Sequence, residues 1–174
     1  MSGIDIAIIV TVLVAALGAG AFFLIRHLRS KRKKAAQFDF ATKHGIDVKL
    51  SPELADLKPE TVEEWTESVV SFWEEKKGWS REKMLKNLAK VGIFLYDELY
   101  LNRVGIKVNG ITWPNKFEIE MATLPKEGSS HTPFTKVKSL FRHETSHVLA
   151  GYVGGVPFDN VTHHALFSEV GLGA

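Results

Sequence analysis

The sequence contains no cysteine, which excludes a disulfide framework, a cysteine-ligated zinc finger and thiol catalysis. Any bound metal must therefore be held by histidine, aspartate or glutamate side chains. A strong charge of one sign is also missing, because the formal net charge is only +2. Residues 1–34 hold six of the 22 lysines and arginines but only one acidic residue, so the remaining chain has a formal net charge of −3. This balance makes nucleic acid a poor candidate for a partner.

The sequence shows no internal repeat, and its 174 residues are enough for one folded domain but not comfortably for two. Hydrophobic residues make up 45% of the chain, which predicts a packed core rather than disorder. We divide the chain into a transmembrane anchor (1–25), a basic juxtamembrane segment and linker (26–50), and one folded domain (51–174). Within the linker, residues 35–50 have the pattern of a tether or a short strand.

Residues 4–25 form an apolar run in which Asp5 is the only charged residue. About 20 apolar residues in a helix cross the roughly 30 Å hydrocarbon core of a bilayer. A cleaved signal peptide normally begins with basic residues, which "MSGID" lacks, so we predict a retained single-pass anchor in the lipid bilayer. A basic cluster follows at residues 26–34. The positive-inside rule then predicts that the N-terminus lies outside and the domain in the cytoplasm.

The folded domain begins with helical patterns. "SPELADL" and "KPETVEEWTESVVSFWEEKKG" each carry a proline in a first helical turn. In the second stretch apolar residues recur at helical spacing and predict an amphipathic helix: Val62, Trp65, Val69, Phe72 and Trp73. Ser80 is a suitable N-cap for a further helix, which gives way to the β-prone stretch "GIFLY".

Strand patterns come next. Two short apolar runs flank Asn109-Gly110, a residue pair that predicts a β-hairpin turn. "KFEIEM" alternates strictly between charged and apolar residues, which predicts a half-buried strand at a sheet edge. A helix is expected from about Lys136 to Val153, where two glycines stop it, and a last short helix begins near residue 159. The order of these elements predicts an α+β fold.

The first of these two helices contains the motif His143-Glu144-Thr145-Ser146-His147. Residues four apart project from one face of a helix, so His143 and His147 can point their imidazoles at one ion. Zinc accepts such nitrogens at about 2.0–2.1 Å and, in catalytic sites, keeps one position open for water. Glu144 lies roughly 100° round the helix, beside the ion. Its carboxylate can there accept a proton from zinc-activated water.

The motif has two uncharged central residues and two apolar residues after it, a pattern that resembles the signature of the zincin metallopeptidases. The resemblance covers the motif and, more loosely, the order of strand, active-site helix and final helix from about residue 104 onward. It implies a zincin-like domain with a small antiparallel or mixed sheet. It also implies that His143 and His147 bind zinc and that Glu144 is the general base. By position, "KFEIEM" would be the zincin edge strand that binds an extended substrate.

The third zinc ligand must come from the residues after the motif. The metzincin subclass is excluded, because its glycine and histidine three and six residues after the second motif histidine are absent here. Glu169 is the only glutamate left for the ligand position of a gluzincin. "HHALF" has the spacing of the H-G-x-x-F element of SprT-like zincins, with histidine in place of its glycine, and this similarity implies His163 as ligand and Phe167 as core. We therefore expect His163 first, His164 second and Glu169 third.

Two other polar residues lie near the motif in the sequence. Asp159 is expected as a turn or helix-cap residue, or as a partner of a ligating histidine, rather than as a metal ligand. His131 lies in a loop before the motif helix, where an exposed position is expected more than contact with substrate.

The leading prediction is a membrane-anchored zinc metallopeptidase that hydrolyses peptide or protein substrates, with Glu144 as general base. A first alternative is an endopeptidase or amidase acting on cell-wall peptides, which requires the domain to face outward, against the charge rule. A second alternative is a non-catalytic, zinc-stabilised binding module tethered to the membrane. Glu144 argues against this module, because a structural zinc site has no use for a general base. The acidic domain and the anchor argue against a SprT-like role on DNA-bound proteins.

Overall fold

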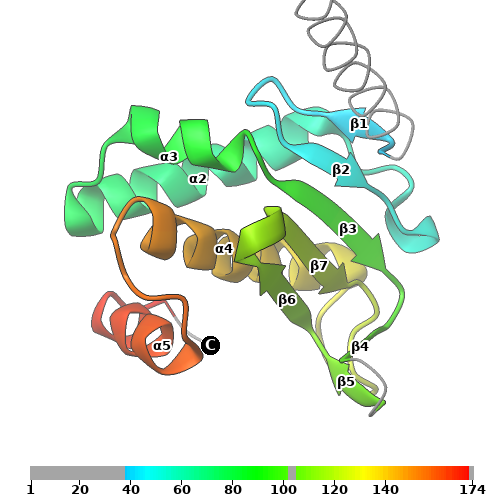
Figure 1. The fold of residues 1–174 in the computed structure, drawn as a ribbon. Helices are drawn as coiled ribbons and strands as arrows, with labels where there is room; N and C mark the ends of the chain where they lie inside the picture. The colour runs from blue at the N-terminus through cyan, green and yellow to red at the C-terminus, as the bar shows by residue number, and fades with distance from the viewer. Residues whose placement is uncertain (1–37, 102–104, 173–174) are drawn as a thin grey trace, which may run out of the picture. The chain divides into compact units, whose positions relative to one another are not determined.

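Figure 1 presents the computed structural model, which describes residues 38–101 and 105–172. The predicted membrane anchor at residues 4–25 lies outside these ranges. Among the helices that the structure describes, none is long and apolar enough to cross a membrane. The described chain from Phe38 onward forms one unit that combines helices with a small sheet. This is the α+β fold that the sequence predicts.

Five strands form a mixed sheet in the order β1-β2-β3-β7-β6. Their bounds are β1 (Phe40–Ala41), β2 (Asp47–Lys49), β3 (Gly92–Tyr96), β6 (Gly110–Trp113) and β7 (Glu118–Ala122). Strand β3 runs parallel to both β2 and β7, whereas β1 and β6 pair antiparallel with their neighbours. A separate two-stranded ladder pairs β4 (Leu99–Leu101) with β5 (Ile106–Val108). The open edges of the main sheet are therefore β1 and β6.

The helices form in the stretches that the local sequence signals predict, although the motif helix begins at Pro133, three residues before the expected start, and "SPELADL" forms only a short 3₁₀ turn. They are α2 (Pro59–Lys77), α3 (Arg81–Leu88), α4 (Pro133–Tyr152) and α5 (Asn160–Glu169), with short 3₁₀ turns at η1 (Pro52–Leu54) and η3 (Pro114–Lys116). Helix α2 carries proline in its first turn and ends at Gly78, whose φ of 64° is left-handed. The Ser80 side chain caps α3 by accepting a hydrogen bond from the Lys83 amide, which confirms the predicted cap.

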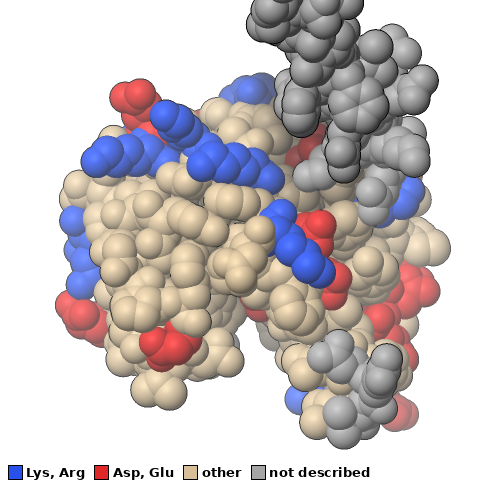
Figure 2. All heavy atoms as spheres, in the orientation of Figure 1, with Lys and Arg blue, Asp and Glu red and all other residues tan. Residues whose placement is uncertain are grey.

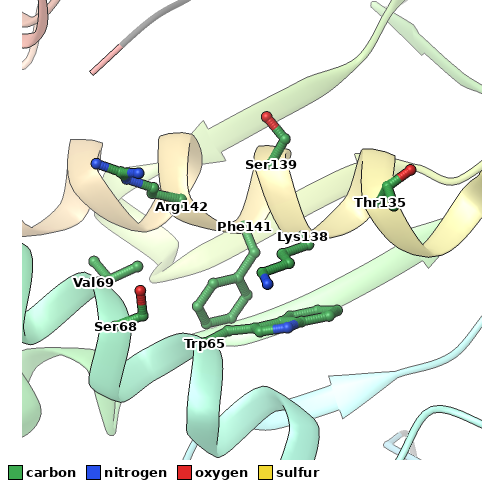
Figure 3. A pocket seen from close by; sticks show the side chains of 8 residues that line it. All are labelled: Trp65, Ser68, Val69, Thr135, Lys138, Ser139, Phe141 and Arg142. Atoms are coloured by element: carbon green, nitrogen blue, oxygen red, sulfur yellow. The ribbon is translucent and has the colours of Figure 1, made fainter. Parts of the chain in front are cut away.

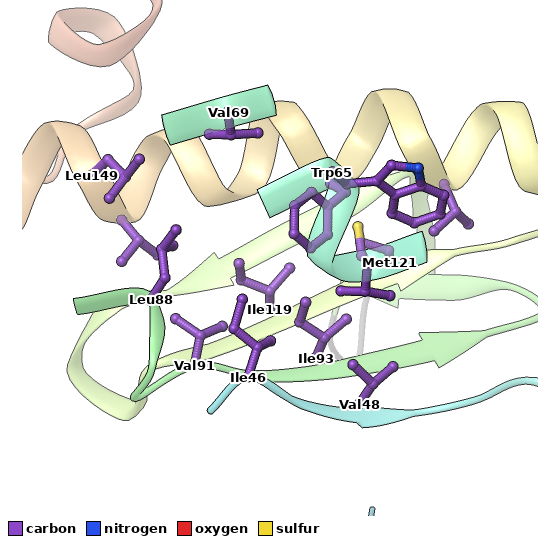
Figure 4. Close-up of a cluster of buried hydrophobic side chains, with 14 of the residues drawn as sticks. Ile46, Val48, Trp65, Val69, Leu88, Val91, Ile93, Ile119, Met121 and Leu149 are labelled. Atoms are coloured by element: carbon purple, nitrogen blue, oxygen red, sulfur yellow. The ribbon is translucent and has the colours of Figure 1, made fainter. Parts of the chain in front are cut away.

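One face of the sheet packs against α2 and α4, and the core lies between them (Figure 4). Ile93 of β3 and Ile119 and Met121 of β7 are buried there together with Trp65 and Val69 of α2. The charged residues that alternate with them on β7 are only half-buried. The alternation of "KFEIEM" therefore identifies correctly which face of its strand is buried.

Two predictions about strand pairing are wrong. Asn109-Gly110 does not form a hairpin turn, because β5 pairs with β4 while β6 pairs with β7. Strand β7 is not an edge strand, since it lies between β3 and β6. Local alternation reports the buried face of a strand but carries no information about its neighbours. The edge position beside α4 belongs to β6.

The sheet also begins earlier than the boundary that we drew at residue 50. Residues assigned to the linker form β1 and β2, and Val48 of β2 pairs with Ile93 of β3. Ile46 and Val48 are both buried in the core. These strands have only two and three residues, so they are too short for a periodic signal in the sequence.

Candidate metal centre

Helix α4 carries the motif, and its start is fixed by the chain itself. Thr132 and Thr135 form a capping box, in which each side chain accepts a hydrogen bond from the other residue's amide, and Pro133 occupies the first turn. Three turns further on, the Nε2 atoms of His143 and His147 lie 3.2 Å apart. Two nitrogens bound to a tetrahedral zinc at about 2.0–2.1 Å are roughly 3.3 Å apart. The two histidines are therefore spaced as a pair of ligands.

His164 in the first half of α5 joins these two histidines. One nitrogen from each of His143, His147 and His164 can be chosen so that all three atoms lie within 4.8 Å of one another. The His164 ring is exposed, whereas His147 is buried. The three side chains form a group that could hold a metal ion, since neutral imidazoles are common metal ligands. A separation of 4.8 Å between two nitrogens is longer than the roughly 3.3 Å between two ligands of a tetrahedral zinc. Tight coordination by nitrogens so far apart requires a small inward shift of an imidazole.

His163, which the sequence predicts first as third ligand, lies on the side of His147 that faces away from His143. Its Nδ1 is 2.7 Å from Nδ1 of His147, whereas Nε2 of His147 faces His143. The two nitrogens of His147 therefore have different partners, and His163 contacts the one turned away from the group. His163 is only 2% exposed and its ring stacks on that of His147. The assignment of His163 as a ligand remains a prediction, and the geometry favours His164.

The remaining candidates lie at different distances from the histidine group. The carboxylate of Glu169 accepts a hydrogen bond from the Lys77 ammonium at 2.7 Å and is exposed, so the structure does not bring it to the group. Asp159 caps α5, and its carboxylate accepts hydrogen bonds from the amide and hydroxyl of Thr162, which confirms the expected cap. His131 is exposed, as expected, although it lines a hollow next to the histidines.

The environment keeps His147 neutral. Burial lowers the pKa of His147 to about 3, and the neighbouring charges of His143, His163 and His164 act in the same direction. Burial also lowers the pKa of His163, against the opposing effects of the Val156 backbone and Asp159. A metal ligand must be an unprotonated imidazole, so this environment favours the form that binds metal.

Glu144 is buried beside the histidines and held by the edge strand. Its Oε2 accepts a hydrogen bond of 2.6 Å from the Thr112 hydroxyl, which also reaches the Glu144 carbonyl at 3.1 Å. Burial raises the pKa of Glu144 to about 7, and the bond from Thr112 opposes this rise. A carboxyl group with a pKa near neutrality can both accept and donate a proton at physiological pH. Glu144 therefore has the environment of a general acid–base group.

The position of Glu144 depends on a glycine in β6. A β-carbon at Gly110 would lie 2.3 Å from Oε1 of Glu144 and 2.8 Å from Cδ, far inside normal contact distances. The absence of a side chain thus allows the carboxylate to lie against the strand backbone. A glycine within a strand often marks such a close approach.

Thr145 and Ser146, the two central motif residues, hold the buried face of α4 in place. The Ser146 hydroxyl donates to the Arg142 carbonyl at 2.7 Å and accepts the indole N–H of Trp73 at 2.8 Å. The Thr145 hydroxyl donates to the Phe141 carbonyl. Both hydroxyl-bearing residues are fully buried, so α4 is tied to α2 by a satisfied polar contact within the core.

Phe167 of α5 packs against the rings of His143 and His147. Its ring centroid is 4.8 Å from that of His147 and 5.3 Å from that of His143, and the residue is 2% exposed. The predicted core position of Phe167 is confirmed. This contact packs α5 against the face of α4 that carries the motif.

Two hollows flank the histidine group. They have volumes of about 580 and 630 Å³ and share four residues: Gly110, His143, Glu144 and His164. The first continues toward Trp113 and Phe158, and the second toward Lys136 and the loop at residues 125–129. In Figure 2 the surface is hollowed between the part that carries α5 and the β4–β5 ladder. The histidines and Glu144 are therefore accessible from an open cleft.

A further cavity of about 280 Å³ lies between α2 and α4 (Figure 3). Trp65 and Phe141 give it an apolar wall, and Lys138 and Arg142 lie around it. It is lined by neither a carboxylate nor a histidine. This cavity is therefore separate from the candidate metal centre and offers no metal ligands.

The sequence did not identify Thr112 or Gly110 as parts of the site. Both lie more than thirty residues before Glu144, and only the pairing of β6 with β7 brings them to α4. Gly110 did carry a signal, but the Asn-Gly pair led us to interpret it as a turn residue. A glycine inside a short apolar run is a signal that another part of the chain approaches the strand backbone closely.

Comparison of the chain with protein families, curated proteins and solved structures finds no match. The case for a metal centre therefore rests on the geometry of the described residues. That geometry consists of the three histidines, the buried carboxylate and the open cleft.

Proposed function

We propose that this protein is a membrane-anchored zinc metallopeptidase that hydrolyses peptide bonds with Glu144 as general base. One observation carries the proposal. A buried carboxylate, oriented by Thr112, lies in the same cleft as a group of three histidines. A structural metal site would need the histidines, but it would not need a buried acid–base group beside them.

Zinc is the metal that suits these ligands best. Three imidazole nitrogens with an open fourth position are a common catalytic zinc arrangement, and the chain offers no thiolate. The 3.2 Å separation of the His143 and His147 nitrogens fits zinc-ligand geometry. We assign His164 as the third ligand and His163 as the partner that orients His147 through the Nδ1 contact.

When bound, zinc would polarise the substrate carbonyl and lower the pKa of water at the open position. Glu144 takes a proton from the attacking water as the new C–O bond forms. It then passes that proton to the amine nitrogen as the C–N bond breaks, so the carboxylate is regenerated. Thr112 keeps one carboxylate oxygen fixed during this exchange, since its hydroxyl already donates to Oε2.

The edge strand supports a peptide as the substrate. Strand β6 ends the sheet order, so one side of its backbone is not paired within the sheet. An extended peptide can add to such an edge by backbone hydrogen bonds. Because Gly110 and Thr112 of β6 both contact Glu144, a peptide on this edge would pass close to the general base.

The membrane attachment rests on the sequence. The apolar run at residues 4–25 is long enough for one span, and the basic cluster after it favours a cytoplasmic position for the domain. Protease protection of sealed vesicles tests this topology. An outward-facing domain would instead favour action on cell-wall peptides.

The decisive experiment compares the full-length chain with its Glu144→Gln variant, both purified in detergent. Zinc content is measured by mass spectrometry, and hydrolysis is followed on a broad peptide library. We expect equal zinc content and a loss of hydrolysis by a factor of about 10²–10⁴ in the variant, the contribution typical of a general base. Glu82→Gln, at an exposed position on α3, is the matched control and should behave as wild type.

Two outcomes would count against the proposal. Zinc binding without any hydrolysis that depends on Glu144 would favour the non-catalytic binding module. Hydrolysis that persists in Glu144→Gln would show that another group acts as the base.

A further inference from the structure

The cleft beside the histidines follows strand β6 along helix α4. At the start of the strand, Gly110 approaches Glu144. At its end, the Pro114 carbonyl accepts a hydrogen bond of 3.0 Å from the hydroxyl of Tyr152, two turns further along α4. Strand and helix therefore run in the same direction. The two hollows that share His143 and His164 lie toward opposite ends of this path.

The end toward the start of α4 is cationic. Lys136 lines the hollow, is half-buried, and donates a hydrogen bond to the Leu124 carbonyl at 2.5 Å. Lys126 lines the same hollow, and the charges of Lys126 and Lys107 lower the pKa of Lys136, after burial as the main cause. In the described part of the chain, neither Lys126 nor Lys136 forms an ion pair. These lysines are available to an anionic ligand.

The carboxylates near this end do not neutralise it. Glu98 is hydrogen-bonded to Lys107. Glu127 lines the hollow but is exposed to solvent, where its charge is screened. Glu144 points instead to Thr112. The cationic end therefore contrasts with a domain whose overall charge is mildly acidic.

The hollow toward the end of β6 contains exposed apolar side chains. Phe158, which is 43% exposed, lines it together with Trp113 and Pro114, beside the polar side chains of Asp159 and Asn160. No lysine or arginine lines this hollow among the described residues. The carboxylate of Asp159 is occupied by its capping bonds to Thr162. Exposed apolar side chains that line a cleft typically mark a binding surface.

We propose that the cleft selects peptides with bulky apolar side chains before the scissile bond and a carboxylate about three residues after it, bound by Lys136 and Lys126. This inference rests on the proposed peptidase function. Lys136 precedes His143 by seven residues, or roughly 10 Å along the helix axis, which about three extended residues span. Antiparallel pairing with β6, the more stable mode, directs the C-terminal side of the peptide toward Lys136.

The carboxylate can come from an acidic side chain or from the C-terminus of a short peptide. The test uses the full-length, zinc-loaded chain in detergent and matched peptides with Leu or Phe before the bond. One series carries Glu, Gln or Lys at the third position after the bond. A second series ends at that position as a free acid or an amide. The first series reports side-chain recognition, and the second reports recognition of a C-terminus.

We expect kcat/KM to be about fivefold higher for Glu than for Gln, or for the acid than for the amide, as for an ion pair at a partly exposed position. Lys136→Gln should remove this preference. Lys138→Gln is the matched control, because Lys138 lies on the same helix but lines the separate cavity of Figure 3. Lys126→Gln, in an exposed loop, provides a second variant that does not alter a helix.

A binding measurement makes the test independent of turnover. Calorimetric affinities of the same peptides for Glu144→Gln should show the same preference, and Lys136→Gln in that background should abolish it. Cleavage that depends on Glu144 but treats Glu and Gln peptides alike would overturn this inference and leave the proposed function intact. A preference that survives Lys136→Gln and Lys126→Gln together would also overturn it. Absence of any Glu144-dependent cleavage would overturn both.

Discussion

Replacement of Gly110 by alanine should damage catalysis without emptying the metal site. The new β-carbon would lie 2.3 Å from Oε1 of Glu144, whereas nonbonded contacts of this kind lie near 3.5 Å. The carboxylate must therefore move away by about 1 Å. The hydrogen bond from Thr112 to Oε2, now 2.6 Å, would then stretch beyond the range of a normal hydrogen bond.

The size of the effect follows from this displacement. A misplacement of about 1 Å at a reacting group typically costs about 10²-fold in rate, which corresponds to about 2.7 kcal/mol in activation free energy. The histidines do not contact Gly110 in the same way, because the nearest side-chain atoms to its added β-carbon all belong to Glu144. We therefore expect wild-type zinc content in Gly110→Ala and a loss of about 1–3 kcal/mol in unfolding free energy, because a buried carboxylate loses its hydrogen bond.

A double-mutant cycle tests whether the loss acts through Glu144. Peptide hydrolysis and zinc content are measured for wild type, Gly110→Ala, Glu144→Gln and the double variant. In the Glu144→Gln background, Gly110→Ala should cost almost nothing further, since the carboxylate proposed as general base is already gone. Retention of more than a third of the wild-type rate by Gly110→Ala would refute the reasoning. Loss of zinc from that variant would refute it as well.

Two further predictions concern the metal site and the fold. His164→Ala should empty the site in a zinc titration. His163→Ala should weaken zinc affinity by about 10–100-fold, because His147 loses its partner. The reverse ranking of the two variants would restore His163 as the ligand. Trp73→Phe removes the donor to Ser146 and leaves space in the core, so denaturant unfolding should show a loss of about 1–3 kcal/mol. A Trp73→Phe loss unchanged in the Ser146→Ala background would show that this hydrogen bond contributes nothing.

The sequence predicted the helices of this fold well because their signals are local. Proline at the start of α2, glycine at its end, and the caps Ser80 and Asp159 each act within a few residues of their helix end. The motif on α4 is equally local, since one helical turn sets the distance between its histidines. A distance within one helix can be predicted without knowledge of the tertiary structure.

The pairing of strands could not be predicted in the same way. The apolar runs on either side of Asn109 and Gly110 have a hairpin pattern, yet they belong to different sheets. The pairing depends on β7, which returns antiparallel to β6 and occupies the position that a hairpin would have filled. Local propensity favours the shortest connection, whereas burial of Ile119 and Met121 under the helices determines the actual order.

The choice between His163 and His164 as third ligand shows the same limit within the candidate site. His163 and His164 are adjacent, so their side chains differ by roughly 100° around α5. Which of them faces the motif histidines depends on the rotation of α5 against α4. Phe167 fixes that rotation by packing beneath His143 and His147. The spacing between His163 and Phe167 predicted the buried position of Phe167 correctly but could not report this rotation.

The short length of β6 limits how strongly a chain can associate with this edge. The strand has four residues, and Pro114 directly after it has no amide hydrogen to donate. A foreign strand can therefore form only a few backbone hydrogen bonds with it, too few for stable self-association of copies through this edge. Under the proposed peptidase function, cleaved products would retain only part of the ladder and would dissociate readily. An open edge this short would then favour release of products over their retention.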